Sequence, residues 1–273
     1  MYGNVTLKAQ WKEAKHTLKT TFYYMTSSGA STSTERSSTV SVLTSSVTVT
    51  APTPASSVTK SGRTYTFSHW SATNAANGAK TTSYTASTDK HNYYAVYTSP
   101  IKITYNGNGN TGGSTTATTG TNKYNYNATS STGVSLTAAS NGFTKTGYSF
   151  QYWTLEKDAN AGYAVGTILP LYSDLTLYVK WSPISYSVNY NGNGSTSGSM
   201  SNQSHTYDTA KNLTANAFKR AFTVTYNYNG NGQTNSTATA NATFNGWATS
   251  SGGSKVYNDK QSVKNLSDRK SVV

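Results

Sequence analysis

The side chains that could do acid–base or metal chemistry are few and scattered in this chain of 273 residues. Only two of its nine carboxylates, Glu156 and Asp158, lie close together, and a calcium site needs more oxygen ligands than these two supply. We interpret their segment as a solvated loop. The histidines are His16, His69, His91 and His205. None belongs to an H-x-x-x-H pair of the kind that binds zinc, so we predict no catalytic residue, metal site or cofactor site.

Sequence patterns for a nucleophile or a phosphate loop are also missing. Serine is abundant, but no serine lies in a G-x-S-x-G sequence, which presents the nucleophile of many hydrolases. The Gly-Asn-Gly runs at 107–109 and 192–194 lead into Thr-, Ser- and Gly-rich turns, whereas a phosphate site would need a helix N-terminus there. Cysteine is absent, which excludes disulfides and thiolate chemistry. We therefore predict that the protein is not an enzyme.

The composition favours thin β-sheets over disorder. Charged residues make up 11% of the chain and aromatic residues 12%, with 22 tyrosines. Disordered chains are poor in aromatic residues, so the low apolar content indicates small cores covered by tyrosine rings. No apolar stretch approaches the length of a membrane span, and no signal peptide is visible at the N-terminus.

The net charge of +13 is spread along the chain. The longest basic runs are the pairs Lys219-Arg220 and Arg269-Lys270. This distribution predicts weak, salt-dependent attraction to polyanions and no specific binding of nucleic acid. Tyrosine and threonine on outward strand faces would also suit stacking on sugars, whereas the competing interpretation is that the tyrosines only cover thin sheets.

Aromatic landmarks recur along the chain with a period of about 84 residues. Trp70, Trp153 and Trp247 each follow an aromatic residue by three positions, and the second step is longer than the first by about 11 residues. Similar closing segments end in an aromatic residue at positions 11, 97 and 181; they are 5–11, 91–97 and 175–181. The sequence Tyr-Asn-Gly-Asn-Gly occurs at 105–109 and again at 190–194. Landmarks that share one period indicate tandem repeats.

These periods divide the chain into modules joined by short linkers. We predict the final strand of a truncated repeat (1–11), a linker (12–16), a degenerate first module (17–98), a linker (99–100), a second module (101–181), a linker (182–183), an incomplete third module with an inserted hairpin (184–267) and a tail (268–273). Two-residue linkers that contain proline leave little freedom, so we expect an elongated, semi-rigid array.

Local patterns predict strands and little helix. Segment 175–181 alternates apolar and polar residues with period two, and so does 101–105. The Asn-Gly pairs that follow predict a hairpin with a type I′ turn, because both residues tolerate positive φ. Segment 148–153 predicts another strand and 156–162 a polar loop. Ser, Thr and Asn are abundant, and they disfavour helix interiors.

Three segments of the second module resemble a known family. They are 103–109 (ITYNGNG), 145–153 (KTGYSFQYW) and 175–181 (LTLYVKW). In this order they resemble the Listeria–Bacteroides repeat, the internalin-type B repeat of bacterial surface proteins. The resemblance implies small β-grasp-like units that serve as spacers or adhesive stalks, and it brings no catalytic residues. The first module departs from the pattern at 23–29, where the Asn-Gly turn should be.

We therefore expect a non-catalytic repeat region of a bacterial cell-surface or extracellular protein that acts as a spacer or stalk with a weakly adhesive surface. Candidate partners are anionic wall polymers, host glycans and host surface proteins, bound weakly and multivalently. The alternative is a carbohydrate- or polyanion-binding accessory module of a secreted protein. Met1 falls inside a strand pattern and the third module stops before its closing strand, so we expect further native sequence on both sides. The tail 268–273 matches the translation of a sequencing-adapter string, and we expect it to be a read-through product.

Overall fold

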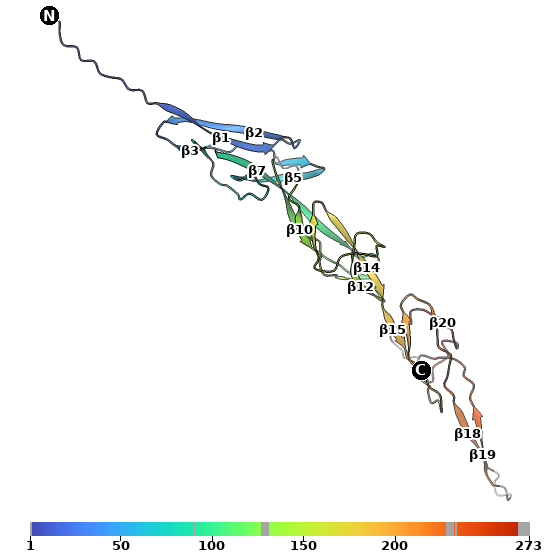
Figure 1. Ribbon diagram of the computed structural model, residues 1–273. Helices are drawn as coiled ribbons and strands as arrows, with labels where there is room; N and C mark the ends of the chain where they lie inside the picture. The colour runs from blue at the N-terminus through green and yellow to red at the C-terminus, as the bar shows by residue number, and fades with distance from the viewer. Residues whose placement is uncertain (1, 90, 127–130, 228–231, 233, 267–273) are drawn as a thin grey trace. The chain divides into compact units, whose positions relative to one another are not determined.

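The structure is a computed structural model of the chain, and it describes residues 2–89, 91–126, 131–227, 232 and 234–266. These residues contain strands and no helix, as Figure 1 shows. The prediction of mainly β structure with little helix is therefore confirmed for the described part of the chain. The predicted non-native tail, 268–273, lies outside the described residues.

The strands are short except for β1, β2 and β7. In chain order they are β1 (Lys15–Met25), β2 (Ser31–Ser41), β3 (Ser46–Thr48), β4 (Ser57–Lys60), β5 (Arg63–Ser71), β6 (Thr85–Ser87), β7 (His91–Asn106), β8 (Gly112–Gly113), β9 (Thr118–Asn125), β10 (Val134–Thr137), β11 (Phe143–Thr144), β12 (Tyr148–Thr154), β13 (Ile168–Leu171), β14 (Leu175–Pro183), β15 (Ser185–Val188), β16 (Gln203–Thr206), β17 (Lys211–Asn212), β18 (Ala221–Tyr226), β19 (Ser236–Asn241) and β20 (Ser262–Val263).

Half of these strands belong to one large mixed sheet. Its main path runs β12-β14-β7-β1-β6-β3, and β2, β4, β5 and β9 pair off this path. The other strands form two-stranded sheets. The chain divides into two compact units. Unit 1 comprises Met1–Asn106, Thr115–Ser140 and Ala161–Tyr178, and unit 2 comprises Gly107–Ser114, Asn141–Asn160 and Val179–Val273.

The core of unit 1 is built largely from aromatic rings. Phe22 lies with its ring centroid 5.0 Å from that of Trp70 and 5.1 Å from that of Tyr93. Tyr97 is fully buried, and its hydroxyl accepts a hydrogen bond from the Met25 backbone N–H at 2.9 Å. Burial raises the pKa of Tyr97. Large rings thus supply the apolar area that the few aliphatic residues do not, because each ring buries more surface than a valine or leucine.

Strand β7 runs without a break through the predicted linker at 99–100, which corrects that prediction. The alternation of buried side chains continues across it, since Tyr97, Ile101 and Ile103 are all buried. Pro100 is tolerated inside the strand, where it faces Thr121 of β9. The predicted linker 182–183 likewise forms the end of β14. Proline predicts a break in a strand, but the apolar period on both sides of Pro100 keeps the strand in place.

Strand β9 joins the predicted second module to the core of the first. It pairs antiparallel with β7 from Val96 to Ile103. Its Tyr124 is buried in the cluster that contains Trp70, and the Asn122 amide donates to the Tyr65 hydroxyl at 3.3 Å. One strand of the predicted second module therefore contributes to the core of the first within unit 1.

The predicted Asn-Gly turns have the expected backbone but not the expected loop length. Asn108 has φ of 47° and Gly109 of 79°, as a type I′ turn requires. The last pair between β7 and β9 is Ile103 with Thr118, however, so residues 104–117 separate these two paired positions. The turn therefore shapes a long loop and does not close a tight hairpin.

The closing segments of the first two modules pair in the same way. In β14, Leu175 lies opposite Ile103 and Leu177 opposite Tyr105, in parallel. In the first module, residues 91–94 of β7 lie parallel to β1, with Tyr93 opposite Phe22. Each predicted closing segment that the structure pairs is thus parallel to the first strand of its own module.

The third closing segment, 5–11, differs from the prediction. Residues 2–14 form no strand, and Trp11 has 92% of its surface exposed. Strand β1 then begins at Lys15, inside the predicted linker 12–16. The alternating pattern is present in the sequence, but a strand needs a neighbour for its backbone groups and its apolar face, and no described residue supplies one.

The core of unit 2 contains a smaller cluster in the predicted third module. It is made of Val188, Tyr190, Leu213, Trp247 and Val263. Strands β18 and β19 pair antiparallel at the place of the predicted inserted hairpin, and the side chains of β19 are exposed. Most of the hairpin's turn lies outside the described residues.

Candidate binding pocket in the third module

A pocket of about 430 Å³ lies in unit 2, within the predicted third module. Three stretches of chain line it, namely 191–195 after β15, 216–222 leading into β18, and 242–255 after β19. Asn193 and Gly194 have φ of 45° and 82°, and this turn folds the first stretch towards the other two. The pocket is therefore formed by loops that the β15 and β18–β19 strands hold in place.

Aromatic rings form the apolar part of the pocket. Trp247 has only 2% of its surface exposed, and its ring centroid lies 4.9 Å from that of Phe244 and 6.4 Å from that of Phe218, both edge-on. Its indole Nε1 is buried and has no hydrogen-bond partner among the described residues. A buried N–H usually has an acceptor, so this donor is an exception among the described residues.

Amide groups form much of the polar part. Asn216 is fixed by two bonds to Phe218, since its Nδ2 donates to the backbone oxygen and its Oδ1 accepts from the backbone N–H, both at 3.0 Å. The Asn193 side chain accepts from the Ser251 hydroxyl at 3.0 Å. Asn245 also lines the pocket and makes no side-chain hydrogen bond among the described residues. Amides of this kind can pair with hydroxyl or carbonyl groups.

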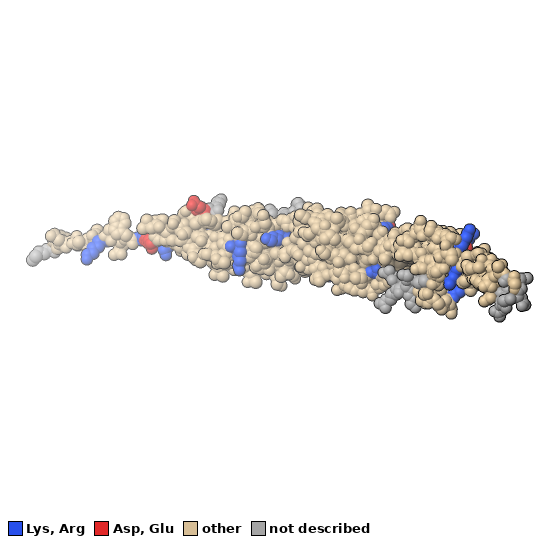
Figure 2. All heavy atoms as spheres, turned by 90° about the horizontal axis from the view of Figure 1, so that it is seen from below, with Lys and Arg blue, Asp and Glu red and all other residues tan. Residues whose placement is uncertain are grey.

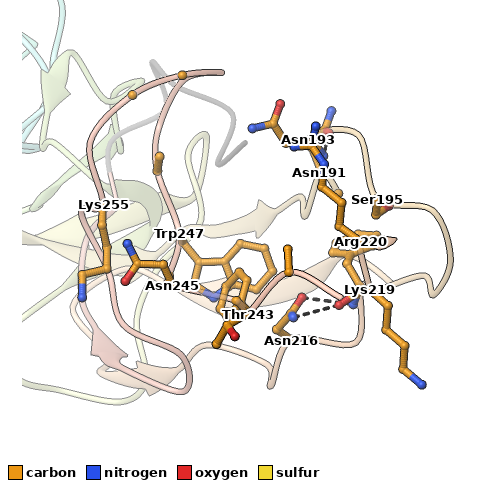
Figure 3. A pocket seen from close by; sticks show the side chains of 18 of the residues that line it. Asn191, Asn193, Ser195, Asn216, Lys219, Arg220, Thr243, Asn245, Trp247 and Lys255 are labelled. Carbon is orange, nitrogen blue, oxygen red and sulfur yellow. Dashed lines mark hydrogen bonds between the residues drawn. The ribbon is translucent and has the colours of Figure 1, made fainter. Parts of the chain in front are cut away.

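Three cations line the pocket, namely Lys219, Arg220 and Lys255, and none of the described carboxylates does. Figure 3 shows Lys255 on one side of Trp247 and Arg220 on the other. The Arg220 guanidinium lies 5.2 Å from the centroid of the Phe222 ring. The ion pairs found within the described part of the chain involve none of these cations. Cations, amides and rings together can bind hydroxylated or anionic groups.

The same place in the second module is filled by its closing strand. The Trp181 indole donates to the Gly107 backbone oxygen at 2.8 Å, and the Asn108 amide donates to the backbone oxygen of Val179 at 2.9 Å. By the repeat pattern, Gly192 and Asn193 correspond to Gly107 and Asn108. The pocket of the third module therefore lies where the second module holds the end of β14.

A polar cluster in unit 2 joins the second module to the third. The Tyr148 hydroxyl donates to Asp208 at 2.6 Å, the Asn265 amide donates at 2.8 Å, and the Lys264 ammonium lies at 3.2 Å. These groups stabilise the carboxylate and lower the pKa of Asp208 from 3.8 to about 2. The hydrogen bond to Asp208 correspondingly raises the pKa of Tyr148. The cluster is exposed, and it links Tyr148 of the predicted second module to Asp208 of the predicted third.

His205 is buried in unit 2. Only 1% of its surface is exposed, and its ring stacks on Tyr186 at 5.5 Å. Neither ring nitrogen has a hydrogen-bond partner among the described residues. Burial and the charge of Lys211 lower the pKa of His205 below 6.5. A neutral, packed histidine of this kind serves the core.

The other residues weighed in the sequence form no site. Among the described residues, no group of three or more His, Cys, Asp or Glu could hold a metal ion. Glu156 and Asp158 lie in a loop, as predicted. Tyr23, Tyr94 and Tyr126 are half-buried and lie with ring centroids 5.1–5.7 Å apart, so these tyrosines cover the sheet and one another. Figure 2 shows Lys and Arg side chains at separate places on the face in view.

Sequence reasoning found the Lys219-Arg220 pair but missed the pocket. Asn191 lies far from Phe244 and Asn245 in the sequence. Its own pattern predicted a turn, and the pattern around Phe244 predicted a core position. The signal that could have located the pocket was the departure of the third module from the repeat. The described part of this module contains no counterpart of β14, and the pocket lies at the corresponding place.

Comparison with family models matches residues 102–180 to the Listeria-Bacteroides repeat domain. This segment is a Listeria-Bacteroides repeat domain. The resemblance stated from the sequence is thus confirmed for most of the second module. The Listeria-Bacteroides repeat is typical of bacterial surface proteins, and no enzyme family was found. Comparison with curated proteins and with solved structures gave no significant match. The described residues include no helix long and apolar enough to cross a membrane.

Proposed function

We propose that this chain is a non-catalytic repeat region of a bacterial cell-surface protein, where it acts as a spacer or stalk with a weakly adhesive surface. The observation that carries the proposal is the Listeria-Bacteroides repeat domain at 102–180. The landmarks that recur with a period of about 84 residues support two further copies of the same unit. Such modules would act through their surfaces and their spacing.

The secondary structure supports the spacer role. Strand β7 carries the chain from the first to the second module without a hinge, and β9 ties both to one core. Hydrogen bonds to Asp208 from Tyr148 and Asn265 link the predicted second and third modules. Junctions of this kind transmit orientation from one module to the next, because bending them would break strand pairing or charge-assisted hydrogen bonds.

The adhesive role follows from the net charge of +13, which would attract anionic wall polymers or host glycans. We expect binding to heparin or teichoic acid that weakens steadily as salt is added, because the contacts are exposed and screened. The measurement is surface-immobilised polymer binding between low and physiological salt. Binding that does not change with salt would contradict an electrostatic surface.

A second candidate function is a carbohydrate- or polyanion-binding module, which the pocket around Trp247 favours. Arg220→Ala and Asn245→Ala should each weaken saccharide binding by about tenfold. Lys80→Ala, a change at an exposed lysine outside the pocket, is the matched control and should bind like the wild type. Saturable binding that persists at high salt would support this candidate. If added salt abolishes binding equally in all variants, the candidate is wrong and binding comes from the general charge of the surface.

A further inference from the structure

Two parallel strand pairs meet on strand β7, and both lie within unit 1. Residues 20–23 of β1 pair with residues 91–94 of β7, and we call this pair the first clamp. Residues 103–106 of β7 pair with residues 175–178 of β14, and we call this pair the second clamp. In each clamp the chain enters along one strand and leaves along the other. Because the strands are parallel, it enters and leaves at opposite ends of the pair.

This arrangement decides how a clamp responds to tension in the chain. A pull on both sides of a clamp slides its two strands past each other, so all the hydrogen bonds between them resist together. Strands that are pulled apart from adjacent ends open one bond after another, which needs less force. Strand β7 is unbroken from His91 to Asn106, so tension passes along it from the first clamp to the second.

Side chains add bonds across the first clamp. The Thr20 hydroxyl donates to the His91 backbone oxygen at 2.6 Å, and the Met25 backbone N–H donates to the Tyr97 hydroxyl at 2.9 Å. Each bond joins β1 to β7, so sliding the strands would stretch it. Phe22 in the paired stretch of β1 is fully buried, and burial strengthens the hydrogen bonds around it by lowering the local dielectric.

A carboxylate adds a bond across the second clamp. The Asp174 Oδ1 accepts from the Lys102 backbone N–H at 3.1 Å, one residue before the paired stretches of β14 and β7. The Arg63 guanidinium lies 3.4 Å from the same oxygen and also donates to the Pro100 backbone oxygen at 2.6 Å. Leu177 in the paired stretch of β14 is fully buried. The second clamp is therefore held by its ladder, by an apolar contact and by charge-assisted bonds.

We propose that unit 1 bears tension and that the first and second clamps are the elements that resist it. Tension runs in series through β1, β7 and β14, and the chain between the two paired stretches of a clamp carries none of it. A spacer only has to hold a distance, whereas this unit keeps its length while a bound partner is pulled. The biological use of this property rests on the proposed stalk function, but the clamps themselves can be measured on the isolated chain.

The first test pulls single molecules of the full chain in a force spectrometer. The chain has no cysteine, so handles can be attached at introduced thiols. Glu13→Cys with Ser185→Cys, both at exposed positions, loads the two clamps in shear. Two ruptures are expected. Each should lengthen the chain by about 20–25 nm, because about 70 residues separate the paired stretches of each clamp and an extended residue spans roughly 3.3–3.6 Å.

The matched control pulls β1 from an adjacent end. Glu13→Cys with Leu43→Cys, again exposed, opens the antiparallel pair of β1 and β2 at its Lys15–Ser41 end, so the bonds break one at a time. The shear direction should need at least about twofold more force at the same loading rate. Equal forces in the two directions would overturn the proposal and leave the spacer role intact. High forces with a compact radius of gyration would instead contradict the stalk and leave the clamps intact.

The second test removes one bond from the second clamp. Asp174→Ala deletes the acceptor of the Lys102 N–H, and the circular dichroism spectrum checks that the chain still folds. One of the two rupture forces should fall about 1.5-fold, because a charge-assisted bond is lost, and the other should stay unchanged. Asp158→Ala removes an exposed carboxylate from the loop between the paired stretches and should keep both forces. A fall in both forces or in neither for Asp174→Ala would overturn the assigned path of tension.

Discussion

At the scale of single residues, buried rings carry the stability of this chain. Trp153 is fully buried and lies edge-on to Phe150 at 5.2 Å and to Phe143 at 6.4 Å. Trp247 has the same relation to Phe244 and Phe218 in the third module. The sequence already indicated both tryptophans by their spacing from an aromatic residue. It could not show that the Trp247 Nε1 has no partner among the described residues, because that depends on which segments surround the ring.

Trp153→Ala should lower the free energy of unfolding by about 3–5 kcal/mol, because it removes a large ring from a closed core and leaves a cavity. Chemical denaturation followed by circular dichroism measures the change. Trp11→Ala is the matched control, since Trp11 is exposed and its loss should cost nothing. Equal stability of the two variants would contradict the assignment of Trp153 to the core.

His205 should make the third module less stable as the solution is acidified. Its pKa is lowered in the folded state, so below about pH 6.5 the unfolded chain takes up a proton that the folded chain resists. The contribution of His205 to the free energy of unfolding is therefore complete above pH 6.5. It declines as the pH falls towards the lowered pKa of the folded state. Melting temperatures at pH 7.5 and 5.5 should differ less in His205→Phe than in the wild type. His91→Gln, at an exposed histidine, should keep the wild-type difference.

At the scale of elements, alternation identified strands well and partners poorly. Residues 148–153 and 175–181 form β12 and β14 as predicted, because their apolar residues recur with the period of a strand. Strand β9, with the sequence TTGTNKYN, has no such period, and its pairing with β7 was not predicted. Which strand lies beside which depends on contacts between residues far apart in the chain. The local sequence pattern therefore predicts where a strand lies but not which strand pairs with it.

The joint between the second and third modules should depend on the lack of a side chain at Gly147. A Cβ there would clash with the Tyr207 ring, and Gly147 has φ of 77°. Gly147→Ala should therefore destabilise unit 2 by more than the roughly 1 kcal/mol that positive φ costs alone. Gly166→Ala is the control, because Gly166 has φ of 84° and no atom within 4 Å of the added Cβ. Equal destabilisation of the two variants, measured by denaturant unfolding, would contradict this contact.

At the scale of the whole molecule, the predicted array of modules has a simple test. A compact chain of this length would have a radius of gyration of about 19 Å. We expect a clearly larger value from small-angle scattering of the chain, because the repeat pattern predicts an elongated array of modules. A radius no larger than that of a compact chain would contradict the stalk, although it would leave the repeat domain at 102–180 intact.

The sequence by itself determined the β-rich fold class, the strands at 148–153 and 175–181, the buried Trp153 and Trp247, and the family of the second module. These features are local, because the alternation of apolar residues in a strand and the spacing of aromatic residues can be read from consecutive positions of the sequence. Only the tertiary structure decided that β7 passes through Pro100, that Tyr124 joins the core of the first module, and that β16 is the one described strand beside β15. Each of these depends on which distant segments meet, since backbone pairing and burial are settled between strands and not within them.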